Sequence, residues 1–102
     1  MPTYIVLIDY TEHGIEHVKD TLHRVDALRE QLKSSESLEG VDFKAAWWTL
    51  GEHFDGINLF EAPDDETMAA ASATIAEHGN ARLTTMRAFT EDEMKGVLGK
   101  VA

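Results

Sequence analysis

Four segments of the chain carry the apolar patterns of β-strands, at residues 3–10, 41–50, 54–62 and 81–89. The first segment has large apolar side chains at its odd and even positions alike. A strand with one face in water would alternate between apolar and polar residues. We therefore expect the sheet to which this strand belongs to be covered on both faces.

The second strand supports the same expectation. Strict alternation along residues 41–50 places Phe43 and Trp47 on one face and Trp48 on the other, so neither face is left to water. Gly51 supplies the positive φ that a short hairpin needs. The second and third strands are therefore predicted to be joined by a tight reversal near Gly51.

A long helix is predicted between the first two strands. Thr11 is a good N-cap, and the helical pattern continues to about residue 34 or 35. Its apolar residues recur at spacings of three and four and form a single stripe, which indicates a helix that covers one side of another element. The residues of this stripe are Ile15, Val18, Leu22, Val25, Leu28 and Leu32.

Two further helices are predicted in the second half of the chain. Asp64 can cap a helix with an alanine-rich body, and Gly79 ends it. Thr90 and Glu93 have capping-box spacing before a short last helix, whose apolar side is formed by Met94, Val97, Leu98 and Val101.

The element order is therefore β-α-β-β-α-β followed by a terminal helix. Right-handed crossovers and a central hairpin give an α+β, ferredoxin-like domain over residues 1–102, with four antiparallel strands and both main helices on one face. Because the strands are apolar on both sides, the second face would be a patch larger than monomers normally expose. We expect a second copy to cover it, sheet against sheet, as a homodimeric α/β barrel.

A short motif lies at the predicted hairpin: Gly51 is followed, after a short spacer, by aromatic Phe54 and then by Asp55. This motif resembles the signature of the GYD-domain family, small proteins of poorly defined function. The resemblance extends, in order and spacing, to residues 3–7, 60–66 and 79–89. It also implies a dimeric α/β barrel. The tyrosine of the family name is Phe54 here, so a phenolic hydroxyl is absent at this position.

The composition fits one soluble domain. The chain has 102 residues, of which 43% are hydrophobic, and it contains no cysteine, so disulfides and cysteine-ligated metal sites are excluded. We find neither a membrane-spanning apolar run nor a leader sequence, and we expect a cytoplasmic protein. The formal net charge of −10 disfavours binding to nucleic acids and to anionic membranes.

A metal site is a weak alternative on the first helix. His13, His17 and Asp20 are spaced by four and three residues and would share one surface stripe, where a divalent ion could bind. The stripe lies toward the polar side of the helix, where solvated histidines are ordinary. We therefore expect no resident metal, and no motif indicates another cofactor.

His53 and Asp55 flank Phe54 at the hairpin and are candidate ligand-binding residues. In one interpretation they form a His/carboxylate pair at the mouth of a cavity, with His53 as a general base. In the other, His53 is a solvated turn residue and Asp55 bonds to the backbone and fixes the turn. Both interpretations remain open at this point.

Four polar residues interrupt otherwise apolar strand faces: Asp9, Asn58, Arg82 and Arg87. Buried polar groups need partners, and Asp9 or Glu61 could pair with an arginine across the sheet or the dimer. Alternatively, an arginine, a tyrosine and a tryptophan line a pocket for a small, partly apolar anion. The candidate ligand-binding residues in this interpretation are Tyr10, Trp47, Trp48 and Arg87.

Three functions are compatible with these patterns. The first is a homodimer that binds a small, partly apolar ligand between sheet and helices or at the dimer seam. The second, by analogy of fold alone, is an enzyme such as a cofactor-independent monooxygenase or an isomerase, or a haem-handling protein. The third is a structural or regulatory dimerisation module. No catalytic residue is identified.

Overall fold

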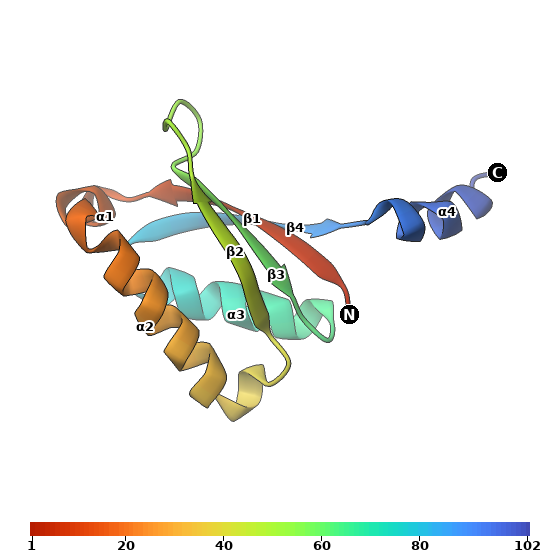
Figure 1. Ribbon diagram of the computed structural model, residues 1–102, viewed down its shortest axis with the longest axis horizontal. Helices are drawn as coiled ribbons and strands as arrows, with labels where there is room; N and C mark the ends of the chain where they lie inside the picture. Colours follow the sequence, from red (N-terminus) through yellow and green to blue (C-terminus); the bar gives the residue numbers. More distant parts are fainter.

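The computed structural model describes residues 1–102 and contains one four-stranded antiparallel sheet with the strand order β2-β3-β1-β4. The strands are β1 (Thr3–Tyr10), β2 (Asp42–Trp48), β3 (Gly56–Glu61) and β4 (Ala81–Ala88). The helices are α1 (Glu12–Glu16), α2 (Thr21–Ser34), α3 (Asp65–Glu77) and α4 (Glu91–Gly99), with 3₁₀ turns at Val18–Asp20 and Glu36–Leu38. This arrangement agrees with the predicted α+β, ferredoxin-like fold (Figure 1).

The core lies between one face of the sheet and the two long helices, α2 and α3. On β1 the side chains of Tyr4, Val6 and Ile8 are buried in this layer. The other buried apolar residues of the core are Leu32, Leu38, Phe43, Phe60, Ala62, Met68 and Ala71. They come from both long helices and from β2 and β3 as well, so both helices cover the same face, which we call the helix face.

The first helix differs from the prediction because it is broken into α1, a 3₁₀ turn and α2. Thr11 caps α1 as expected, and its hydroxyl accepts a hydrogen bond from the Gly14 amide. The Thr11 amide also donates to the Asn80 carbonyl at 3.1 Å. These bonds hold α1 against the connection between α3 and β4, and the helix ends at His17, whose φ of −114° is not helical.

The break also explains why half of the predicted apolar stripe is not buried. Ile15, Val18 and Leu22 are 52%, 43% and 65% exposed. Only the three residues in the later turns of α2, namely Val25, Leu28 and Leu32, pack against the core. The stripe prediction is therefore correct for the second half of the segment and wrong for the first half.

A β-bulge on β2 changes which side chains share a face. The register shifts between Phe43 and Ala45, so that Phe43 pairs with Phe60 and Trp48 pairs with Gly56, both on the helix face. The prediction that Phe43 shares a face with Trp47 is wrong, because one residue is inserted into the strand at the bulge. The two tryptophans do lie on opposite faces, as expected.

The connection between β2 and β3 is longer than predicted. Seven residues, 49–55, separate the strands, so the reversal is a loop instead of a tight turn. Gly51 does have a positive φ of 80°. The Asp55 amide donates to the Ile8 carbonyl at 2.7 Å, which ties the base of the loop to β1.

The other two helices begin as predicted. The Asp64 carboxylate caps α3 by accepting from the Thr67 amide at 2.8 Å, and Thr90 and Glu93 form a capping box at the start of α4. Figure 1 shows α4 standing clear of the sheet beyond the end of β4. No helix combines the length and the apolar character that a membrane-spanning segment needs.

The face of the sheet opposite the helices, which we call the open face, has no helix against it and is apolar at its centre. The cross-strand registers show which residues of β1, β2, β3 and β4 have their side chains on this face. Trp47 and Met86 are 54% and 41% exposed there. The remaining apolar residues of the open face are the half-buried Ile5, Leu7, Ala45, Ile57, Leu59 and Ala88.

The total surface of the chain is large for its mass. A folded monomer of 11.4 kDa is expected to expose about 5,800 Å². This chain exposes 6968 Å², roughly 1,200 Å² more than that expectation. The radius of gyration is 14.7 Å, whereas a compact domain of this length has about 13 Å. Figure 1 shows that α4 and the β2–β3 loop extend away from the sheet, and both extensions contribute to these excesses together with the uncovered open face.

The contact of Gly14 with Asn80 gives a testable prediction. A Cβ added at Gly14 would lie 1.9 Å from the Asn80 carbonyl oxygen, which belongs to the backbone and cannot move freely. We expect Gly14→Ala to lower the free energy of unfolding by about 1–3 kcal/mol, measured by urea denaturation.

The matched control is Gly96→Ala in α4, where an added Cβ meets nothing within 4 Å. Alanine in a helix interior should leave stability unchanged or raise it by up to about 1 kcal/mol. Equal effects of the two substitutions would contradict the close packing of α1 against the connection between α3 and β4.

Candidate ligand-binding cavity

A cavity of about 200 Å³ lies between the helix face and the two long helices, toward the end of the sheet where β1 leads into α1. Ten of its 17 lining residues are hydrophobic. The lining comes from all four strands, from α2, and from the end of α3 with the turn that follows it. Its apolar part includes Ile8, Val25, Leu28, Phe43 and Ile75.

Three polar side chains meet at one side of the cavity. The Trp48 indole Nε1 donates to the Tyr10 hydroxyl at 3.0 Å and lies 3.2 Å from Thr21 Oγ1. The Tyr10 and Thr21 oxygens are 2.7 Å apart. This cluster joins β2, β1 and α2, and it holds the indole in place although Trp48 is 44% exposed.

Arg24 lies beside this cluster. Its guanidinium carbon is 5.7 Å from the centre of the Tyr10 ring, within cation–π range. Nη1 donates to the His17 carbonyl at 2.9 Å, and Nη2 is 3.5 Å from the Gly14 carbonyl. None of the ion pairs in the structure includes Arg24. These contacts connect α2 to α1. Arg24 also lines the cavity, where it is a cation with no carboxylate partner in the protein.

One histidine and several side-chain amides supply the remaining polar groups of the cavity. His78 Nε2 lies 3.0 Å from Gln31 Oε1, which connects the end of α3 to α2. Asn58 is half buried, and its carboxamide makes no hydrogen bond to another group of the protein. Gly56 also lines the cavity, and a Cβ there would lie 2.9 Å from the Trp47 carbonyl oxygen. The cavity therefore combines an apolar body with polar groups that can orient a small ligand.

Comparison with known proteins identifies the family. The family model for the GYD domain matches residues 4–98, nearly the whole chain. This chain belongs to the GYD-domain family. A glutamine synthetase and cystathionine beta-lyase binding protein from Thermus thermophilus is 32% identical to this GYD domain over 89 residues, which are 87% of this chain and 90% of that protein.

The fold is similar to that of a solved plant protein. The crystal structure of At3g17210 from Arabidopsis thaliana superposes with a TM-score of 0.54, and the match covers 88% of the GYD domain described here and 95% of the plant chain. The two sequences are only 9% identical, so the likeness concerns the fold alone.

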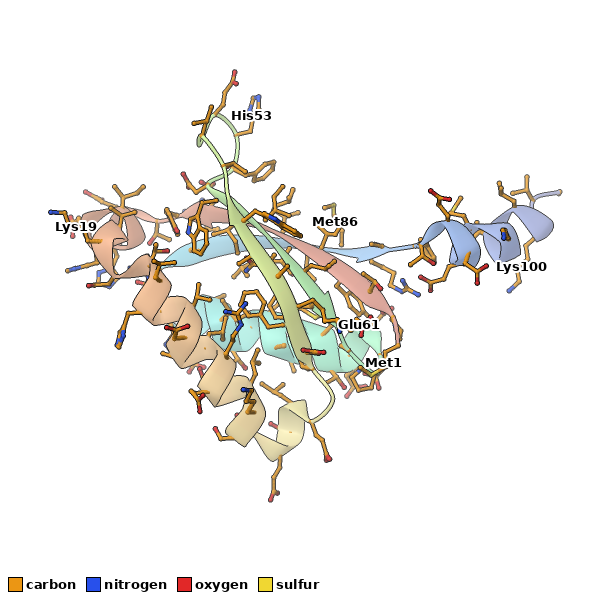
Figure 2. All side chains as sticks on the ribbon, in the orientation of Figure 1. Met1, Lys19, His53, Glu61, Met86 and Lys100 are labelled. Atoms are coloured by element: carbon orange, nitrogen blue, oxygen red, sulfur yellow. The ribbon has the colours of Figure 1, made fainter.

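The cavity brings together some of the predicted ligand-binding residues of the GYD domain and leaves out others. Tyr10 and Trp48 are among its lining residues, whereas His53 and Asp55 are not. Trp47 also borders the cavity, although its side chain lies on the open face. Figure 2 shows His53 at the tip of the loop between β2 and β3.

The signature residue Asp55 makes backbone contacts instead. Its carboxylate accepts from the Tyr10 amide at 2.8 Å, and its carbonyl accepts from the Thr49 amide at 3.0 Å. Its Oδ1 lies so close to Gly51 that an added Cβ there would be 3.2 Å away. The motif of glycine, aromatic residue and aspartate therefore fixes the β2–β3 loop against the end of β1, which is the structural interpretation of Asp55.

Arg87, the last of the predicted ligand-binding residues, lies in a separate shallow groove between α3 and β4. Its Nη2 forms an ion pair with Glu93 Oε2 at 2.9 Å. The Thr90 amide and this guanidinium both lower the pKa of Glu93. In the same groove the Tyr4 hydroxyl donates to Asp65 Oδ1 at 2.5 Å. Burial, followed by this bond to Asp65, raises the pKa of Tyr4 to about 12.

The histidines of α1 are close together, but not in the predicted group. His13, Glu16 and His17 are all exposed, and their possible ligand atoms lie within 4.8 Å of one another. Asp20 is not in this group, because the helix ends at His17 and residue 20 no longer shares the same face. The three side chains could approach one divalent ion.

Sequence reasoning did not select Arg24, Thr21, Gln31 or His78 for the cavity. Arg24 directly precedes Val25, one of the core-packing residues of α2, so it lies at the edge of the buried stripe. A basic residue at the edge of a buried apolar stripe is the one feature of the sequence that could have indicated Arg24 as a cavity residue. The contribution of His78 depends on α3 reaching Gln31 of α2, which no local pattern indicates.

Proposed function

We propose that this GYD domain is a homodimeric binding protein that holds a small, partly apolar ligand in the cavity between sheet and helices. The cavity itself is the observation that carries the proposal. It is lined mainly by apolar side chains and has a few convergent polar groups at one side, the combination typical of ligand sites. A pocket of about 200 Å³ fits a ligand smaller than most cofactors.

The proposed dimer is supported by the open face. A typical stable interface buries about 800 Å² on each partner, and the chain exposes roughly 1,200 Å² more than expected for its mass. In a two-fold dimer the same patch must match itself, and the open face has apolar side chains at its centre and charged ones, such as Asp9 and Arg82, at its end. We therefore propose a second copy of this chain as the occupant of the open face.

Helix α4 fits the same proposal. It has nine residues, fewer than the roughly 12–15 that an isolated helix needs for marginal stability in water. Its apolar residues Val97 and Leu98 are 37% and 62% exposed, and it extends away from its own sheet. Docking of α4 onto the second copy would bury this apolar side.

A second candidate function is binding to a partner enzyme. It is favoured by the name of the Thermus thermophilus relative, a glutamine synthetase and cystathionine beta-lyase binding protein. We propose that this GYD domain can also bind an enzyme of one of these two kinds. The two functions are compatible, because a ligand in the cavity and a partner on the outer surface use different parts of the molecule.

Native mass spectrometry of protein isolated without denaturation tests the ligand proposal. We expect a non-covalent small molecule on the wild-type protein that is lost on denaturation. Ala81 lines the cavity, so Ala81→Leu should fill part of the volume and remove the bound mass. Ala70→Leu, on the exposed side of α3, is the matched control and should keep it. A bare wild-type protein, or a bound mass unaffected by Ala81→Leu, would refute the cavity as the ligand site.

Sedimentation velocity with purified glutamine synthetase and cystathionine β-lyase from the same source tests the second candidate. We expect this protein to co-sediment with at least one of the two enzymes at micromolar concentration, and to remain separate from an unrelated enzyme of similar charge. Independent boundaries in every mixture would rule out this function for the isolated pair.

A further inference from the structure

The cavity differs in charge from the rest of the molecule. The chain has 19 acidic and nine basic residues and a formal net charge of −10. None of the 17 residues that line the cavity is an aspartate or a glutamate, whereas Arg24 and His78 are both among them. In this acidic protein the cavity lining therefore contains cationic side chains and no carboxylate. Such a site repels cationic ligands and favours anionic ones.

Arg24 has hydrogen-bonding capacity left for a ligand. An arginine side chain offers five N–H donors, and the two contacts that Arg24 makes to carbonyl oxygens use two of them. The Gly14 contact is long at 3.5 Å. Arg24 is half buried and forms no ion pair within the protein, so its guanidinium can pair with the anionic group of a ligand. A carboxylate is the small anion whose two oxygens match the guanidinium geometry.

The rest of the lining determines the body of the ligand. Val25, Leu28 and Ile75 give the cavity an apolar wall, and the Tyr10–Thr21–Trp48 cluster lies on the side of Arg24. The volume of about 200 Å³ admits one ring or a short hydrocarbon chain with an acidic end, but not a nucleotide or a larger cofactor.

We propose that the cavity selects small monocarboxylates with an apolar body, and that Arg24 binds the carboxylate. This inference rests on the proposed function, since it names the ligand class of the same cavity. Arg24 is then the residue that determines specificity, and the Trp48 indole reports on occupation because it lies beside the carboxylate position.

The test uses two matched pairs of probes that differ in charge but hardly in shape: phenylacetate with phenylacetamide, and hexanoate with hexanamide. Each probe is titrated into the intact protein, and the Trp48 indole N–H resonance is followed by NMR. We expect at least one carboxylate to bind about tenfold or more tightly than its amide, a difference of about 1.4 kcal/mol.

Variants locate the source of this preference. Arg24→Gln should abolish the preference for the carboxylate, and Arg24→Lys, which keeps the charge, should retain part of it. Lys33→Gln is the charge-matched control, because Lys33 is exposed on the same helix and is not a cavity residue, and it should keep the full preference. The wild-type comparison stands by itself if Arg24→Gln fails to fold.

The possible outcomes distinguish a failure of the monocarboxylate assignment from a failure of the proposed ligand-binding function. If carboxylate and amide bind equally, or the amide binds better, the carboxylate assignment is overturned while the cavity remains a ligand site. An unchanged preference in folded Arg24→Gln would overturn the role of Arg24. If none of the four probes shifts the resonance of Trp48 or of any other cavity residue, the monocarboxylate assignment is overturned, and the native mass spectrum alone decides whether the cavity holds another ligand.

Discussion

The structure depends on one mismatch: the sheet is apolar on both faces, and the helices of one chain cover only one of them. The helix face buries Val6 and Phe60 completely and Tyr4 almost completely. The open face leaves Trp47 more than half exposed, although it belongs to the same strand as the buried Phe43. Burial of apolar surface is the dominant favourable term in folding and association. The open face is therefore an apolar surface that no helix of the same chain covers, and covering it would release further free energy.

The cavity has its origin in the way the chain enters α2. Thr11 and Gly14 hold α1 against the turn after α3, and the helix breaks at His17 before α2 begins. Arg24 reaches back across this break to the His17 carbonyl and so reaches the cavity edge. The same geometry brings Thr21 to Tyr10 and Trp48. The break in the first helix thus builds the polar side of the cavity, while the regular part of α2 supplies the apolar side.

The order of elements, the caps and the family could be predicted from the sequence because their causes are local. Thr11, Asp64 and the Thr90–Glu93 box act on amides within three residues of themselves. The failures have non-local causes. The placement of α1 involves Asn80, which contacts Gly14 although more than 60 residues separate the two in the sequence. The bulge at Lys44 shifts the side-chain period of β2 by one residue, which alternation alone does not reveal.

The residues of the candidate site also divide into those indicated by local sequence patterns and those that depend on distant parts of the chain. Tyr10 and Trp48 were predictable as large side chains on a strand face, and they line the cavity. Asp55 matched a family signature, but its carboxylate bonds to the Tyr10 amide, so the signature identified a structural contact. Arg24 could not be selected from the sequence because its place at the cavity depends on the broken helix. The lack of acidic residues in the cavity lining is equally hidden. It becomes visible only once the fold brings together residues from the four strands, α2 and α3.

The accessibility of Trp47 tests the central claim most directly, that a second copy covers the open face. In a Trp48→Phe variant the tryptophan fluorescence comes from Trp47 alone. If two sheets pack face to face, acrylamide should quench this emission only weakly, and quenching should strengthen on dilution as the dimer dissociates. Quenching as strong as that of free tryptophan, unchanged across protein concentration, would contradict the account, because the 54% exposure of Trp47 in the single chain would then persist in solution.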